Sequence, residues 1–371
     1  MKNRNKSIPA KFFGVGDQFK ETALNTRKEL LKQGQDNILA LETSCDETAA
    51  AVITDLAGEP KLLSSQVASQ IDAHEKFGGV VPEIASRRHL ELLENVIEKA
   101  LTEADISQEK LTAVAATQGP GLVGALLVGF AAGKALAYAR QIPFIGTNHV
   151  AGHIYANFLV HENIQAPFVC LTVSGGHTEL LYFSSRTDYE ILGRTRDDAA
   201  GEAFDKVARF LQLGYPGGPA IEEKARAGNP DNVELPRSLE HQETYDFSYS
   251  GLKTAVINYV HNSRQRGEQI DLSDLAASFQ LAVVESLLPQ VERAIKNYNP
   301  RSLLLAGGVA ANSLLRQEFA ELADNHDISL YLPPLDLCTD NAAMIGAAAY
   351  YKLQAEEVDG LEAEVKPTLS L

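Results

Sequence analysis

Apolar and polar residues follow one another along the chain in two similar successions. In the first, apolar runs of strand length at residues 38–43 and 49–54 have the spacing of paired strands, and residues 61–67 are compatible with a third strand. Segments with apolar residues every three or four positions then predict helices separated by short buried strands. The same order begins again with a strand pair at 168–174 and 178–183.

A strand pair followed by alternating helices and strands, occurring twice, predicts a duplicated α/β fold. Each half starts with antiparallel strands and continues with parallel ones. We expect lobes at 37–165 and 166–354, a loosely ordered extension at 1–36 and a loose acidic tail at 355–371. The other expected elements are strands at 113–117, 142–146, 302–306 and 328–332 and helices at 83–104, 121–140, 149–160, 201–213, 220–227, 251–262, 272–297, 310–323 and 341–353.

Composition and charge narrow the class of protein. The 371 residues carry a net charge of −16, which argues against general polyanion binding but allows a nucleic acid substrate held by a local basic patch or a partner protein. The 3 cysteines lie far apart and form no disulfide framework, so we expect a reducing, cytoplasmic environment. The longest apolar candidate, residues 119–139, is interrupted by glycines and Lys134, so we expect no membrane span.

Two glycine pairs mark places where backbone N–H groups are able to meet a ligand. Gly175-Gly176 lies between apolar runs, which is the usual signal of a hairpin turn and also permits close approach to a phosphate. Gly307-Gly308 follows a strand and precedes a helix that carries Asn312 on its first turn, so the positive end of the helix dipole would face a ligand. Close helix–strand packing, with Asn312 as a polar cap, is the alternative. Neither a GxxxxGK[ST] nor a GxGxxG loop occurs.

Acidic residues open the predicted helix around residues 197–206, which include Asp205. Carboxylates in a first helical turn usually stabilise the helix dipole. An aspartate here is also able to accept hydrogen bonds from ribose hydroxyls, although spacing alone favours the dipole interpretation.

Two histidines, His149 and His153, fall on one face of a predicted helix. The zinc-protease motif requires Glu directly after the first histidine as general base, and Val150 stands there instead. A third ligand must therefore come from elsewhere, and Asp336 and Asp340 before the last predicted helix are both candidates. Two histidines and one carboxylate bind Fe(II) or Zn(II) and leave positions open for a substrate.

Ten short motifs then occur in order along the chain. They are LETSCDET (41–48), FGGVVPEIASRRH (77–89), QGPGLVGALLVG (118–129), NHVAGH (148–153), TVSGGHTEL (172–180), GEAFDKVAR (201–209), YPGGP (215–219), FSYSGLKT (247–254), AGGVAANSLLR (306–316) and CTDNAAMI (338–345). Together they resemble the tRNA N6-adenosine threonylcarbamoyltransferases, from about residue 38 to residue 353. The resemblance implies a duplicated, two-lobed fold of the actin/sugar-kinase/Hsp70 kind, which is ribonuclease H-like and has a central cleft.

By this resemblance the protein transfers the threonylcarbamoyl group from threonylcarbamoyl-AMP to N6 of the adenosine at position 37 of tRNAs that read ANN codons, and AMP leaves. The implied ligands of one divalent metal are His149, His153 and Asp340, with Fe(II) the usual assignment and Zn(II) the alternative. The residues implied to surround the carbamoyl and phosphate groups are Thr172, Val173, Ser174, Gly175 and Gly176. Those implied to contact the nucleotide are Asp205, Gly218, Asn312 and, at a position that varies among relatives, Glu222.

Asp46 and Glu47 lie between the first two predicted strands. The exocyclic amine of adenine is a poor nucleophile, so a carboxylate that takes its proton during bond formation would accelerate the reaction roughly 10²–10⁴-fold. We expect this role for Asp46 in preference to Glu47; the alternative is that Asp46 only caps the turn. Many relatives have Glu where Ala151 stands, but that position lies off the face of the two histidines.

The resemblance also implies partners. Bacterial relatives work with a paralogous dimerisation partner and a small ATPase, and the tRNA site is shared among them. An apolar face on the helix at 83–104 either meets such a partner or packs on its own core. The alternatives to the transferase are an ATP-binding kinase or ATPase of the same fold and a regulatory protein with an inactive site.

Overall fold

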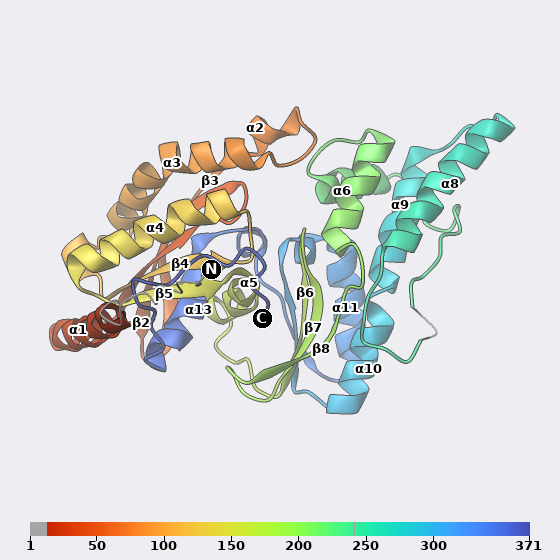
Figure 1. Cartoon of the computed structure of the whole chain (residues 1–371). Helices are drawn as coiled ribbons and strands as arrows, with labels where there is room; N and C mark the ends of the chain where they lie inside the picture. Colours follow the sequence, from red (N-terminus) through yellow and green to blue (C-terminus); the bar gives the residue numbers. More distant parts are fainter. Residues whose placement is uncertain (1–12, 240–241) are drawn as a thin grey trace, which may run out of the picture. The chain divides into compact units, whose positions relative to one another are not determined.

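The structure, a computed structural model, describes residues 13–239 and 242–371 (Figure 1). The chain forms two compact α/β units. Of the described residues, the first unit comprises residues 13–70, Pro82–Gly152 and Asn341–Leu371, and the second comprises Ile71–Val81 and the described part of His153–Asp340. Each unit is built on its own 5-stranded mixed sheet, as the repeated pattern of strands and helices predicts.

The sheet of the first unit has the strand order β3-β2-β1-β4-β5. Its strands are β1 (Asn37–Glu42), β2 (Glu47–Leu56), β3 (Glu59–Ser69), β4 (Ala113–Gly119) and β5 (Phe144–Asn148). β1 pairs antiparallel with β2 and parallel with β4, and β4 pairs parallel with β5. Every residue of β1 and β4 is buried, as in sheets covered on both faces. The carboxyl ends of β1, β4 and β5 therefore lie along one edge of the sheet.

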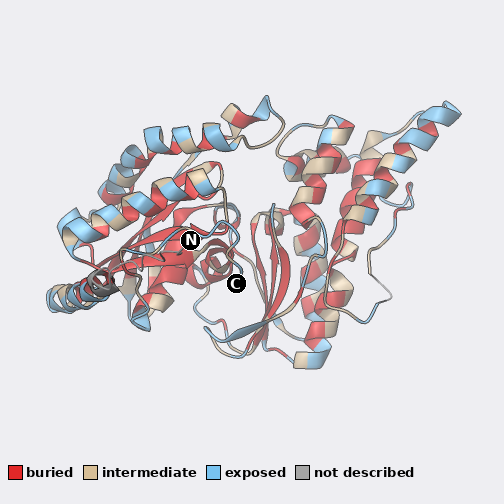
Figure 2. Cartoon of the chain, in the orientation of Figure 1, coloured by how far each residue is buried: buried red, intermediate tan, exposed pale blue. Residues whose placement is uncertain are grey.

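Helices cover both faces of this sheet, and their buried sides face it (Figure 2). α3 (Pro82–Glu103) and α4 (Val123–Arg140) pack on the face that carries Leu39 and Val52. α13 (Ala342–Gln354) packs on the opposite face, so closely that a Cβ on Gly346 would lie 2.4 Å from Ile53. This helix belongs to the first unit, which corrects the expectation of one lobe at 166–354. The sequence pattern identifies the helix but not the sheet it covers.

α4 is long and apolar enough to cross a bilayer by length and composition, a test that the core helices of soluble proteins also pass. In this structure Leu126 and Phe130 are buried in the first unit. The absence of a side chain at Gly129 lets its N–H donate to the hydroxyl of Thr43 at 3.1 Å, and that hydroxyl donates to the carbonyl of Ala125 at 2.9 Å. The small residues of α4 therefore serve its close packing on the sheet.

The N-terminal extension is ordered from residue 13 onward, which corrects the expectation of a loose segment at 1–36. Residues 1–12 lie outside the described part of the chain. α1 (Phe13–Leu31) carries Arg27, whose Nε donates to the carboxylate of Asp36 at 2.8 Å. Both side chains are buried, and Asp36 also accepts from the hydroxyl of Thr112 at 2.9 Å. A buried ion pair with a further donor holds α1 on the first unit in a way that composition does not reveal.

The acidic tail at 355–371 is also packed on the first unit instead of loose. Lys134 donates to the carbonyls of Leu361 and Ala363 at 3.2 and 2.8 Å. The N–H of Lys366 donates to the carbonyl of Gln118 at 2.7 Å, at the end of β4. Backbone hydrogen bonds of this kind do not depend on side-chain identity, so the polar composition of the tail gives no sign of them.

The sheet of the second unit has the order β10-β9-β6-β7-β8. Its strands are β6 (Phe168–Val173), β7 (Thr178–Phe183), β8 (Tyr189–Arg194), β9 (Ser302–Ala306) and β10 (Ser329–Tyr331). β6 pairs antiparallel with β7 and parallel with β9, which repeats the arrangement around β1. The strand β8 was not expected from the sequence, because half of the residues of this edge strand are exposed and it lacks a long apolar run.

The helices of the second unit lie largely where the spacing predicts, with two exceptions. The helix predicted at 272–297 is two helices, because Pro289 lacks an N–H group and stands in the first turn of the second. The helix predicted at 149–160 ends early and continues as a 3₁₀ turn. The observed elements of the second unit are α2 (Ile71–Glu75), η3 (Ala156–Leu159), α6 (Ala200–Leu211), α7 (Gly217–Ala225), α8 (Ser250–Arg266), α9 (Leu272–Glu285), α10 (Leu288–Tyr298), η4 (Gly308–Ala311), α11 (Ser313–Asn325) and α12 (Leu335–Cys338). The helix α5 (His149–Tyr155) begins in the first unit and ends in the second, and η2 (Gln108–Lys110) belongs to the first unit.

Candidate functional site

The two predicted histidines open the short helix α5. Asn148, the last residue of β5, accepts hydrogen bonds from the N–H groups of Val150 and Ala151 at 2.8 and 3.1 Å and so caps the helix. This cap starts the helix at His149, and His153 follows one turn later on the same face. Both imidazoles are buried, with residue exposures of 8% and 1%. They are not two ordinary surface histidines.

The third member of the cluster is Asp340, whose Oδ1 lies 3.3 Å from Nε2 of His153. One potential ligand atom from each of His149, His153 and Asp340 lies within 4.8 Å of the others. Asp336, the other aspartate that the sequence leaves open, is exposed on α12 and outside this group. Two imidazole nitrogens and a carboxylate oxygen at this spacing fit a divalent transition metal such as Fe(II) or Zn(II).

Glu42 is a residue of this region that sequence reasoning missed. It is fully buried at the end of β1, and its Oε2 lies 3.0 Å from Nδ1 of His149. The hydroxyl of Thr117 donates to the same oxygen at 2.8 Å, and the N–H of Ser44 donates to Oε1. The available signal was a charged residue that ends a fully buried strand, since a buried carboxylate is rare unless it has partners.

Asp46 and Glu47 follow β1 in the turn to β2. Asp46 is buried, and its backbone carbonyl accepts from the N–H of Gln70 at 3.0 Å. Within residues 13–239 and 242–371, its carboxylate has no hydrogen bond or ion pair, so turn capping is not what it does there. Glu47 is half-buried and accepts from the hydroxyl of Ser69 at 3.3 Å.

A cavity of about 260 Å³ lies within the second unit, at the glycine turns. Five of the nine residues expected at the substrate line it: Gly175, Asp205, Gly218, Glu222 and Asn312. The other lining residues are Gly201, Phe204, Pro216, Pro219, Gly308, Val309, Ala311 and Thr339. The chain thus brings together residues from the turn after β6, from α6 and α7, and from the turn after β9.

The segment from Thr172 to Gly176 comprises the last two residues of β6 and the first part of the hairpin turn to β7. The N–H of Ser174 donates to the carbonyl of His177 at 2.8 Å, and the hydroxyl of Ser174 accepts from the N–H of His177 at 3.1 Å. Val173 points into the hydrophobic core, so its side chain does not face the cavity, and Thr172 is fully buried. Gly176 is exposed but outside the cavity lining. Any contact of these positions with a ligand would therefore run through the turn itself.

Two polar residues of the cavity also shape its walls. Asp205 accepts from the N–H of Gly217 at 2.7 Å and so caps the start of α7. Asn312 caps α11 by accepting from the N–H of Leu315 at 3.0 Å, which matches the alternative that it is a polar cap. Because α11 begins at Ser313, Asn312 precedes the helix instead of lying on its first turn, which corrects the expected start at 310.

The amide of Asn312 links further side chains at the cavity. Its Nδ2 donates to Gln280 at 3.1 Å and to Glu222 at 3.3 Å. Glu222 in turn accepts from the N–H of Ser313 at 3.2 Å and from the hydroxyl of the same residue. The cavity therefore presents oriented carboxylate and amide groups, which suit the hydroxyls of a ribose.

The two acidic residues just before α6, Asp197 and Asp198, form hydrogen bonds and ion pairs with other residues of the second unit. Burial raises the pKa of Asp197, but hydrogen bonds from Ser248, Tyr249 and Ser250 at the start of α8 lower it further, so the pKa lies below its usual value. For Asp198, the ammonium groups of Lys206 and Lys253, each at 2.6 Å, outweigh desolvation and hold the pKa low as well. These pairs tie α6 to α8 and leave Asp205 as the acid of the segment that reaches the cavity.

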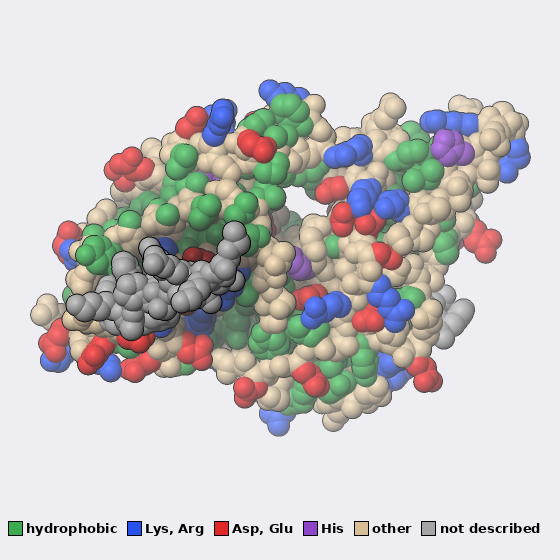
Figure 3. Space-filling model, viewed as in Figure 1, with side chains coloured by type: hydrophobic (Ala, Val, Ile, Leu, Met, Phe, Trp, Pro, Cys, Tyr) green, Lys and Arg blue, Asp and Glu red, His purple; other side chains and the backbone are tan. Residues whose placement is uncertain are grey.

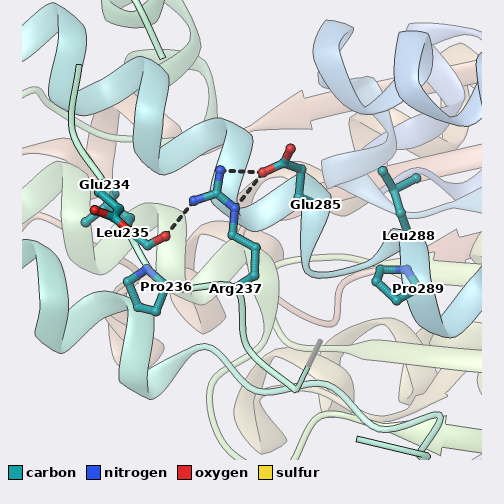
Figure 4. Close-up of a pocket in the computed structure, with 7 residues that line it drawn as sticks. All are labelled: Glu234, Leu235, Pro236, Arg237, Glu285, Leu288 and Pro289. Carbon is teal, nitrogen blue, oxygen red and sulfur yellow. Dashed lines mark hydrogen bonds and ion pairs between the residues drawn. The ribbon is translucent and has the colours of Figure 1, made fainter. Parts of the chain in front are cut away.

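A hollow of about 640 Å³ elsewhere in the second unit is not a comparable site (Figure 4). Its one cation, Arg237, binds the carboxylate of Glu285 and the carbonyl of Leu235. The positive charge is thus neutralised from within, and the other lining residues are Glu234, Pro236, Leu288 and Pro289. The hollow offers no grouping of catalytic side chains.

Comparisons with known proteins agree with this geometry. A sequence model of the tRNA N6-adenosine threonylcarbamoyltransferase family matches residues 61–347. The protein of that name from Halalkalibacterium halodurans is 51% identical over 343 residues, which cover 92% of this chain and 98% of that protein. The one from Moorella thermoacetica is 52% identical over 337 residues, which cover 91% and 98%.

Solved structures show the same fold at low sequence identity. HypF from T. kodakarensis has a TM-score of 0.60 and 14% identity, with 86% of this chain and 48% of that chain covered. Component A of (R)-2-hydroxyglutaryl-CoA dehydratase from Acidaminococcus fermentans has a TM-score of 0.51 and 13% identity, with 86% and 99% covered. These similarities concern the fold alone, and they confirm the expected α/β fold with two mixed sheets.

Proposed function

The chain belongs to the tRNA N6-adenosine threonylcarbamoyltransferase family, and we propose that it modifies adenosine 37 of tRNAs that read ANN codons. The donor is threonylcarbamoyl-AMP, the acceptor is N6 of the adenosine, and the products are the threonylcarbamoylated tRNA and AMP. The observation that carries this proposal is the cluster of the two buried histidines His149 and His153 with the half-buried Asp340. A second support is the cavity whose polar groups suit a ribose.

His149, His153 and Asp340 are the proposed holders of one divalent metal, Fe(II) in preference to Zn(II). A metal bound there supplies a positive charge that stabilises negative charge developing on the carbonyl or phosphate oxygens of the donor. The donor set by itself accepts either ion, since imidazole and carboxylate suit both.

The second unit is the proposed site of the nucleotide portion. Glu222 and Asn312 would accept and donate hydrogen bonds to the ribose hydroxyls. The backbone of Gly175 and Gly176 would lie against the phosphate and carbamoyl groups, where no side chain blocks close approach. Gly218 and Asp205 would line the same nucleotide site, with the carboxylate of Asp205 held by the hydrogen bond that it accepts from the N–H of Gly217.

Asp46 is the proposed general base. The lone pair of N6 attacks the carbonyl carbon of the threonylcarbamoyl group, the bond from that carbon to the phosphate oxygen breaks, and AMP leaves with the bonding electrons. N6 then has one proton too many, and the carboxylate of Asp46 accepts it. Such general base catalysis contributes roughly 10²–10⁴-fold. Glu47, which already accepts from Ser69, is the second choice.

We place the reaction in the cytoplasm, with tRNA held jointly by this chain, a paralogous dimerisation partner and a small ATPase. The net charge of −16 supports shared binding, because a strongly acidic chain repels the phosphate backbone outside local basic sites. An ATP-binding kinase or ATPase of the same fold would need the cavity but neither histidine of α5.

A transfer assay on separate variants of the two adjacent acidic residues, Asp46 and Glu47, tests the catalytic assignment. Metal-loaded protein, tRNA and threonylcarbamoyl-AMP are combined with and without the partner proteins, and the modified nucleoside is quantified by mass spectrometry. We expect Asp46→Asn to slow transfer roughly 10²–10⁴-fold and Glu47→Gln to slow it much less. Loss in the Glu47 variant alone would move the base to that residue. Transfer of phosphate from ATP to a small acceptor, without modification of tRNA, would contradict the proposal.

A further inference from the structure

Glu42 is a buried carboxylate that the proposed reaction does not use. It ends β1, a strand in which every residue is buried, and its own side chain is inaccessible to solvent. An ionised carboxylate costs several kcal/mol to bury unless hydrogen bonds or an opposite charge compensate for it. The groups around the carboxylate of Glu42 therefore indicate which role its negative charge has.

Three groups lie within hydrogen-bond distance of the carboxylate of Glu42, and all belong to the first unit. The N–H of Ser44 donates to Oε1, from the turn that follows β1. The hydroxyl of Thr117, on β4, donates to Oε2 at 2.8 Å. Nδ1 of His149, at the start of α5, lies 3.0 Å from the same oxygen. Glu42 thus connects the carboxyl ends of two parallel strands with the helix that carries the histidines.

The contact with Glu42 decides which nitrogen of His149 carries the hydrogen. A carboxylate only accepts hydrogen bonds, so the hydrogen of a neutral imidazole must sit on Nδ1 to satisfy it. Nε2 is then left with its lone pair, which is the form that binds a metal. The hydroxyl of Ser44, 3.2 Å from Nδ1, is able to donate or accept and does not oppose this tautomer.

We propose that Glu42 is a positioning residue, which fixes His149 in the Nδ1–H tautomer and aims Nε2 at the metal. The inference rests on the proposed metal site for its purpose, but the tautomer itself is a property of the protein without metal. Carboxylates that bind the outer nitrogen of a ligand histidine raise its basicity and orient its ring, and their loss typically lowers metal affinity 10–100-fold.

A merely structural Glu42 would make a different prediction. If its task were only to join β1 to β4, its hydrogen bonds to Ser44 and Thr117 would suffice, and the tautomer of His149 would be indifferent to it. Replacing Thr117 would then disturb the site as much as replacing Glu42.

The first test needs no change to Glu42. In metal-free protein labelled with ¹⁵N-histidine, long-range ¹H–¹⁵N correlations distinguish the Nδ1–H from the Nε2–H tautomer at a pH where the imidazole is neutral. His149→Ala identifies the signals of this residue among the 9 histidines. We expect His149 as the Nδ1–H tautomer. The Nε2–H tautomer, or a mixture of the two, would overturn the proposal whether or not the transferase reaction is correct.

The second test compares two variants by the same spectra and by competition for Zn(II) with a chromophoric chelator. In Glu42→Gln the amide group places an N–H₂ near Nδ1, so we expect His149 to switch toward Nε2–H and the Zn(II) affinity to fall about 10–100-fold. Thr117→Val removes the other hydrogen bond to Oε2 and should leave the tautomer unchanged and the affinity within about threefold. An unchanged tautomer and affinity in Glu42→Gln, or equal losses in both variants, would contradict the proposal.

Discussion

At the scale of single residues, two asparagines place the candidate ligands. Asn148 caps α5 and so sets the helical turn on which His149 lies. Asn341 caps α13 by accepting from the N–H of Met344 at 2.9 Å, and Asp340 directly precedes it. His149 therefore lies at the capped start of α5, His153 lies one turn later, and Asp340 directly precedes the cap of α13.

Replacing each of the two candidate aspartates in turn tests which of them is the third metal ligand. Asp340→Asn removes the negative charge beside His153, so Zn(II) or Fe(II) affinity, measured by chelator competition, should fall by at least the roughly 10–100-fold typical of partners outside the ligand shell. Asp336→Asn makes the same chemical change at an exposed position and should leave metal affinity unaltered. A larger loss in the Asp336 variant would show that the ligand set is wrong.

The cavity residue Asn312 should show an effect on ligand binding separate from its effect on stability. Asn312→Ala removes the cap of α11 and should cost about 0.5–2 kcal/mol of unfolding free energy. Its amide also lines the cavity, so AMP should bind about 2–10-fold more weakly by calorimetry.

The control for Asn312 is Asp271, which caps α9 outside the cavity by accepting from the N–H groups of Ser273 and Asp274. Asp271→Ala should lower stability by a similar amount and leave AMP binding unchanged. Equal AMP affinities in both variants would exclude Asn312 from the nucleotide site.

The sequence predicts single site residues only as far as local spacing reaches. The spacing of His149 and His153 is a property of one helix, so it is visible in the chain. The choice between Asp336 and Asp340 depends on where a distant helix packs, and spacing leaves it open. Glu42 was missed because only the fold shows that the last residue of a strand contacts a histidine more than 100 positions away.

At the scale of elements, the periodic core segments were predictable and the segments held by specific bonds were not. The helix α1 docks through Arg27 and Asp36, and the tail docks through backbone carbonyls bound by Lys134. On α1 only Phe19 and Ala23 are buried in the hydrophobic core of the first unit, so its apolar stripe is short, and the tail has no regular apolar period. The break at Pro289 was visible in principle, since proline marks a helix start as well as an interruption.

The buried ion pair of α1 can be compared with an exposed neighbour. Arg27→Ala leaves the carboxylate of Asp36 buried without its cation, so urea unfolding should show a loss of about 3–5 kcal/mol. Lys28 lies on the same helix as Arg27 and forms an exposed ion pair with Glu356. Lys28→Ala removes this pair and should cost at most about 1 kcal/mol. Equal effects would mean that α1 contributes little to the folded state.

At the scale of the whole molecule, the acidic balance bears on how tRNA is held. Lysine and arginine side chains lie scattered among acidic ones on the face shown in Figure 3. Binding of a polyanion rests mainly on cations that neutralise phosphates and release counterions. A chain with a net charge of −16 should therefore need partners for tight binding.

The isolated chain should bind tRNA weakly, and the affinity should fall steeply as salt rises. The measurement is a filter-binding or anisotropy titration at several salt concentrations, in which the logarithm of the association constant should fall linearly with the logarithm of the salt concentration. Adding the partner proteins should raise the affinity at every salt concentration. Tight binding by the chain alone that is insensitive to salt would contradict this view of the surface charge.

The most direct test of the central claim uses two tRNAs that differ at one nucleotide. Protein loaded with Fe(II) and supplied with its partners is incubated with threonylcarbamoyl-AMP and either a tRNA with adenosine at position 37 or the same tRNA with guanosine there. We expect threonylcarbamoyladenosine and equal moles of AMP with the first tRNA, and no modified nucleoside with the second. We also expect loss of the product in His149→Ala. Modification of both tRNAs, or full activity in His149→Ala, would contradict the central claim.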